Sequence, residues 1–147
     1  MSLQRYIDRL EQFSADFGVP VSRNSMTPEV SGRVEDRRIV LRAGLSLEQQ
    51  LLTRAHELTH LIAHCNASPR LNRTVCEYEA EAVERWVGAA LRVPPYADDW
   101  PDLSVTDDLL ACSVVRVRWV ASTLVSAARG TWASGPDRLQ AQSTVEI

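Results

Sequence analysis

The stretch TRAHELTHLIAH, residues 53–64, contains all three histidines of the chain. Apolar residues recur around it at helical spacing, and Ser46 with Gln49 has the form of a capping box at its start. We therefore predict a helix that runs from Ser46 to about His64. Its core-facing stripe consists of Leu51, Ala55, Leu58 and Ile62.

His56 and His60 lie one turn apart on a flank of this helix, so their two imidazoles can hold one metal ion. Glu57 leaves the helix at a different angle, so it can miss the ion and reach a water molecule that the ion activates. This HExxH spacing is typical of zinc peptidases, and we expect zinc as the cofactor. The alternative is a partly exposed helix flank whose histidines are satisfied by hydrogen bonds.

A catalytic zinc usually has three protein ligands, so a third is needed. His64 lies about 12 Å along the axis from His56, too far to bind the same ion, and we expect it at the surface or rim of the site. The next helix, expected over residues 74–91, carries Glu77 and Glu81 beside its core stripe. The favoured interpretation is that Glu77 binds the metal and that Glu81 accepts the free N–H of a ligating histidine.

Two alternatives remain open on this second helix. Glu81 replaces Glu77 as the ligand in one of them. In the other, Thr74 and Glu77 form a capping box, and no glutamate binds the metal. Glu79 points elsewhere and is predicted to be solvated, whereas Gly88 is expected to let the two helices approach closely.

Apolar periodicity and turn residues predict the remaining elements. In order, they are a helix over residues 3–17, a turn-rich stretch over 22–32, a hairpin over 33–44 and a long helix over 106–128, capped by Thr106. We expect the hairpin to turn at Glu35 and Asp36, and its strand 38–42, which leads into the histidine helix, to form the rim of the cleft.

This order of elements predicts an α+β fold in which a small antiparallel sheet packs on a helical core. Residues 1–128 are expected to form a single domain, and residues 129–147 a flexible tail.

Composition limits the function further. The net charge is −3, so nucleic-acid binding is unlikely on charge grounds, although Arg33, Arg37, Arg38 and Arg42 cluster in the hairpin. No apolar run reaches the length of a membrane span, and the first residues lack the apolar core of a signal peptide. The three cysteines show no CxxC spacing, which indicates reduced thiols and a cytoplasmic protein.

The segment HELTHLIAH, residues 56–64, followed by EYEAEAVERWVGAALRVP, residues 77–94, resembles the ImmA/IrrE family of metallopeptidases. The first segment is specific for a zincin, and the second is moderately specific for the family. The form EYEAEAV, the later Tyr96 and Trp100 and the apolar last helix look closest to the peptidase domain of ArdC antirestriction proteins.

The resemblance implies a zincin-like minimal metallopeptidase domain. It assigns the zinc ligands to His56, His60 and Glu77 and the general base to Glu57. Members of the family cleave helix-turn-helix repressors of the XRE type, so we predict an endopeptidase for a specific protein partner, such as the repressor of a mobile element or stress response. The alternative is a non-proteolytic zincin-fold module with an antirestriction or regulatory role. Tyr78 and Tyr96 are candidate oxyanion donors.

Overall fold

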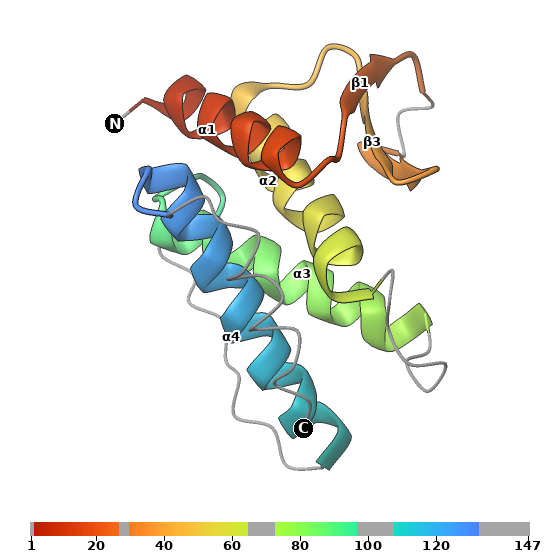
Figure 1. Cartoon of the computed structure of the whole chain (residues 1–147), viewed down its shortest axis with the longest axis vertical. Coiled ribbons are helices and arrows are strands. Elements are labelled where there is room, and N and C mark those ends of the chain that lie inside the picture. Colours follow the sequence, from red (N-terminus) through yellow and green to blue (C-terminus); the bar gives the residue numbers. More distant parts are fainter. Residues whose placement is uncertain (1, 27–29, 65–72, 97–107, 133–147) are drawn as a thin grey trace.

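The computed structural model describes residues 2–26, 30–64, 73–96 and 108–132. The helices are α1 (Leu3–Asp16), α2 (Leu47–Thr59), α3 (Arg73–Ala90) and α4 (Asp108–Arg129). Helix α2 continues into a π-helical turn, η1 (His60–His64). The strands are β1 (Val21–Asn24), β2 (Gly32–Glu35) and β3 (Arg38–Arg42). In Figure 1 the sheet lies beside α1 and α2, and α3 and α4 pack together on the other side of α2. The predicted α+β class is confirmed.

The sheet is mixed and not purely antiparallel as predicted, because β1 pairs with β3 in parallel and β2 pairs with β3 antiparallel. The sequence pattern missed β1, which falls in the stretch read as turns. This strand has four residues with little apolar character, and its partner lies some distance along the chain, so periodicity alone gives no signal.

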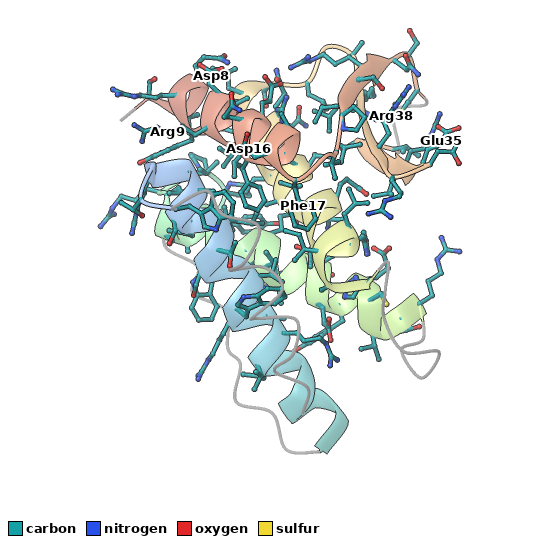
Figure 2. The ribbon with its side chains drawn as sticks, viewed as in Figure 1. Asp8, Arg9, Asp16, Phe17, Glu35 and Arg38 are labelled. Carbon is teal, nitrogen blue, oxygen red and sulfur yellow. The ribbon has the colours of Figure 1, made fainter. Side chains whose placement is uncertain are left out.

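The hairpin itself is confirmed, but its turn lies one residue later than predicted. Asp36 and Arg37 have positive φ angles of 49° and 58°, which suit the two-residue hairpin loop that follows the right-handed twist of the strands. Glu35 and Arg38 pair across this turn and lie at the outer end of the sheet (Figure 2).

The central strand is β3, so it cannot form the free rim predicted for residues 38–42. Ile39, Val40 and Leu41 are all buried, as expected for a strand that is paired on both sides and covered on both faces. The edge nearest α2 is instead β2, because Gly32 lies against Thr53 of that helix. Strand 38–42 directly precedes α2 in the sequence, but this proximity does not determine whether the strand lies at the centre or the edge of the sheet.

The predicted start and core face of α2 are confirmed. Gln49 N–H donates to Ser46 Oγ at 3.2 Å, and Ser46 N–H donates to Gln49 Oε1 at 3.1 Å, which completes the capping box. Leu51, Ala55 and Leu58 are fully buried against the rest of the core, whereas Ile62, the fourth predicted member of this face, is only partly buried.

The end of α4 and the residues after it pack on α1. Trp132 makes an edge-on contact with Phe13, with ring centroids 4.8 Å apart, so the folded region continues past the predicted boundary at residue 128. The remaining residues of the predicted tail and the expected cap Thr106 lie outside the described residues. Of the cysteines, Cys76 is a free thiol. No described helix meets the length and hydropathy of a membrane span.

A buried arginine joins α1, α2 and the sheet. Arg54 of α2 has no exposed side-chain surface and pairs with Glu11 of α1, which also pairs with Arg23 of β1 at 3.1 Å. Burial lowers the pKa of the Arg54 guanidinium, because removing a cation from water costs free energy. Glu11 therefore compensates a charge that has no access to solvent.

We predict that Glu11→Ala lowers the free energy of unfolding by about 2–4 kcal/mol, because it leaves the Arg54 charge buried without its partner. Arg23→Ala is the matched control, since it removes only the exposed pair with the same carboxylate and should cost under about 1 kcal/mol. Urea unfolding of the two variants measures the difference. Equal losses would mean that the buried pair is not the one that stabilises the fold.

Candidate metal centre

The end of the histidine helix widens into the π-helical turn η1. At the junction, His60 N–H donates to the carbonyls of both Glu57 and His56. Single π turns inside α-helices occur frequently at functional sites, and they place more residues in one turn than an α-helix does. His60 and His64 begin and end this turn, and their Nδ1 atoms lie 2.9 Å apart.

A carboxylate from α3 faces the two imidazoles predicted to bind the metal. Glu77 Oε2 lies 3.2 Å from His56 Nε2, and Glu77 Oε1 lies 3.1 Å from His60 Nε2. These three residues form a group that could hold a metal ion, because one ligand atom from each lies within 4.8 Å of the others. Around a tetrahedral ion with bonds of about 2.0–2.2 Å, ligand atoms are roughly 3.3 Å apart, so the group fits one ion.

The electrostatics of this group also suit a metal. Burial lowers the pKa of His60 to about 4, more than the neighbouring Glu77 raises it, so the imidazole is neutral at pH 7. A neutral imidazole keeps a lone pair for a metal. The Glu77 side chain is 53% exposed, so the group opens to solvent on that side, where a water molecule can approach.

Glu57 is buried beside this group. Burial raises its pKa to about 7, and the nearby carboxylates of Glu77 and Glu84 add to the rise while His56 opposes it. A carboxyl group with a pKa near neutrality can both take up and release a proton at physiological pH. A cation bound next to it would lower that pKa, because it favours the charged form.

Gly88 brings α3 close to α2, as predicted. A Cβ atom at this position would lie 3.0 Å from Leu52 Cδ2 on α2 and 2.9 Å from Tyr96 Cβ. The Tyr96 hydroxyl donates a long hydrogen bond of 3.5 Å to Glu84 Oε2, and burial raises the pKa of Tyr96. The contact of Glu84 with Tyr96 and its effect on the pKa of Glu57 were not predicted, although Glu84 lies seven residues after Glu77 on the same side of α3.

The two tyrosines proposed as oxyanion donors differ in their surroundings. The hydroxyl of Tyr96 is engaged with Glu84, whereas Tyr78 follows Glu77 on α3 and is 42% exposed. Their predicted role stays a prediction.

Glu81 is exposed, and in the described part of the chain it makes no hydrogen bond with His56 or His60. The residue that lies beside the second ring nitrogen of His60 is instead His64, whose Nδ1 is 2.9 Å from His60 Nδ1.

The predictions for His64 and Glu79 were wrong. The His64 side chain is 6% exposed and not at a rim, and Glu79 is 1% exposed and not solvated. His64 Nε2 lies 2.7 Å from Glu79 Oε2, and Arg116 of α4 donates to Glu79 Oε1 from Nε at 2.9 Å and from Nη2 at 2.6 Å. The carboxylate is buried because α4 covers it, and α4 begins about thirty residues later in the sequence.

The family model described as the IrrE N-terminal-like domain, Peptidase_M78, matches residues 5–96. The match covers more than half of the chain and includes the histidine helix and α3. Comparisons with curated proteins and with solved structures found no match. The predicted ImmA/IrrE membership is confirmed, while the closer likeness to the ArdC branch stays a prediction. The possible metal site lies on the histidine helix and α3, both of which are within the match. The chain belongs to the IrrE N-terminal-like domain family of peptidases.

Proposed function

We propose that this protein is a zinc-dependent endopeptidase that cleaves one specific protein partner, with a helix-turn-helix repressor of the XRE type as the favoured substrate. The observation that carries the proposal is the convergence of His56, His60 and Glu77 beside the buried carboxyl group of Glu57. Two nitrogen donors and one carboxylate are a usual ligand set for a catalytic zinc that keeps its fourth position open. With such a partner, the protein would act in the cytoplasm.

Each side chain has a distinct role in this proposal. When bound, zinc would polarise the scissile carbonyl and lower the pKa of the attacking water. Glu57 accepts a proton from that water as its oxygen bonds to the carbonyl carbon. The same carboxyl group then donates the proton to the amide nitrogen as the C–N bond breaks, which leaves a carboxylate and an amine. Burial of Glu57 keeps this proton away from bulk solvent.

The outer edge of β2, which pairs only with β3 among the described strands, is the surface that we propose for the substrate. Arg42 N–H donates to Ser31 O at 2.8 Å, and these two residues lie opposite each other in the register of β2 and β3. Because bonded and non-bonded pairs alternate along an antiparallel ladder, the backbone groups of Gly32 and Val34 point away from β3. An extended peptide could therefore add to β2 through main-chain hydrogen bonds, close to the histidine helix.

The metal ligands can be tested one at a time. We predict one zinc per chain in the wild type and loss of that zinc in His60→Ala, because two remaining ligands rarely hold zinc in a protein. Glu77→Ala should also lose it, while Glu81→Ala should retain it as the matched control on the same helix. Elemental analysis after dialysis measures the stoichiometry. Stoichiometric zinc in His60→Ala, or greater loss from Glu81→Ala, would contradict the assignment.

The role of Glu57 separates a peptidase from a binding module. Glu57→Gln keeps the size of the side chain but removes the base, so cleavage should fall by roughly 100-fold or more while zinc and partner binding persist. The measurement is cleavage of the repressor encoded beside this protein, followed by mass spectrometry. If wild type and Glu57→Gln act alike on the partner with zinc bound in both, the non-proteolytic alternative replaces the peptidase.

The edge strand gives a third test. Val34→Pro removes a backbone N–H that points away from the sheet, so the β2–β3 ladder stays intact while an added strand loses a donor. Cleavage should drop roughly tenfold, as expected for one main-chain hydrogen bond of about 1–1.5 kcal/mol. Val34→Ala controls for the lost side chain. A folded, zinc-loaded Val34→Pro that cleaves as fast as Val34→Ala would exclude β2 as the docking edge.

A further inference from the structure

A continuous line of polar contacts runs from His60 through the interior to α4. His60 Nδ1 lies 2.9 Å from His64 Nδ1, and His64 Nε2 lies 2.7 Å from Glu79 Oε2. The other oxygen of Glu79 accepts two hydrogen bonds from Arg116. The line reaches His60 at Nδ1, whereas Glu77 lies at Nε2, so the line contacts the side of the His60 ring opposite the candidate metal.

With His64 in its neutral form, the chemistry of His60, His64, Glu79 and Arg116 fixes the direction of every hydrogen bond. The Arg116 guanidinium can only donate and the ionised Glu79 carboxylate can only accept, so a neutral His64 carries its proton on Nε2. His64 Nδ1 is then an acceptor. His60 must therefore carry its own proton on Nδ1, which leaves the lone pair on Nε2, the atom that lies 3.1 Å from Glu77.

We propose that His64, Glu79 and Arg116 are positioning residues that hold His60 in the tautomer and orientation required for metal binding. The proposal rests on the metal site of the proposed function. A hydrogen bond to the second nitrogen of a ligating histidine commonly fixes its tautomer, and a carboxylate, carbonyl or water usually supplies it. Here a second imidazole accepts the bond, and a buried ion pair between α3 and α4 orients that imidazole.

Burial makes the contacts of His64 and Glu79 hard to replace by water. The side chains of His64 and Glu79 are 6% and 1% exposed, so water cannot readily replace a lost partner. Glu79 is charged and buried, and it is compensated by two donors from Arg116 and one from His64. The competing explanation is purely structural: the ion pair joins α3 to α4, and His64 only fills the space beside it.

Two substitutions at residue 64 separate these explanations, because each preserves one half of the imidazole. His64→Asn places a carbonyl oxygen near the former Nδ1, so it can still accept from His60 but no longer reaches Glu79. His64→Gln places an amide nitrogen near the former Nε2, so it can still donate to Glu79 but offers His60 no acceptor in that position. Zinc affinity by chelator competition and urea unfolding of the metal-free protein are the two readouts.

The proposal expects zinc affinity to fall roughly 10- to 100-fold in His64→Gln, the range for losing a partner behind a metal ligand, and to stay within about threefold of wild type in His64→Asn. The metal-free stabilities should rank in the opposite order, because His64→Gln keeps the contact with Glu79. Equal zinc affinities in the two variants, or affinities that follow the stabilities, would overturn the positioning role.

The far end of the line has its own control. Arg116 and Arg118 lie on the same helix, and Arg118 is exposed. Arg116→Gln should weaken zinc binding by roughly tenfold through loss of order at Glu79 and His64, while Arg118→Gln should leave it unchanged. If the two variants bind zinc equally, α4 has no part in the line.

Nitrogen NMR of the metal-free protein at pH 8 tests the tautomers directly and needs no metal and no substrate. Long-range ¹H–¹⁵N spectra should show His60 protonated at Nδ1 and His64 at Nε2. The reverse pattern would overturn the proposal even if zinc binds. Conversely, the expected tautomers and zinc affinities in a protein that cleaves nothing would leave this inference standing while the proposed peptidase activity fails.

Discussion

The close packing of α3 on α2 is the contact on which the candidate site depends. Gly88 has no side chain at the point where a Cβ would lie 3.0 Å from Leu52 Cδ2 of α2 and 2.9 Å from Tyr96 Cβ, so α3 can pack closely against both side chains there. Glu77 lies eleven residues earlier on the same rigid helix, about 16 Å along its axis. A change in the approach or angle of the helices at Gly88 would therefore move the carboxylate away from the imidazoles of α2. The packing of the apolar faces of the two helices sets this geometry, and the geometry determines where the polar side chains lie.

Apart from the buried carboxyl group of Glu57, two buried charges in the described part of the chain are compensated by partners on other helices. One is Arg54, whose pair with Glu11 joins α1 to α2, and the other is Glu79, in the line from His64 that joins α3 to α4. Isolated buried charges are costly, so each requires a partner from another element. In both places that partner comes from a different helix. The need to compensate these buried charges therefore restricts how α2, α3 and α4 can be arranged around the candidate site.

Local spacing predicted much of the site and fold. The capping box, the core stripe and the two histidines of α2 depend on residues within one helix, and the placement of Glu77 needed only one further helix with a recognisable apolar face. The interpretations that failed depended on distant segments. Glu79 looks like a solvated flank residue until α4 covers it, and His64 looks peripheral until its contact with this buried carboxylate is seen. In the same way, the parallel pairing of β1 has no signature in its four residues.

The family match ends before the last residue of the polar line His60–His64–Glu79–Arg116. Residues 5–96 include the histidines, Glu77 and Glu79, whereas Arg116 lies on α4, beyond that range. The helix that buries Glu79 therefore also supplies the cation that compensates its charge. A carboxylate next to His64 requires a cation in this fold, and α4 supplies it from a part of the chain that the match leaves out. Of the three proposed positioning residues, His64 and Glu79 lie within the matched range and only Arg116 lies beyond it, so α4 would act on the metal centre through Glu79 and His64 and not by direct contact with the ion.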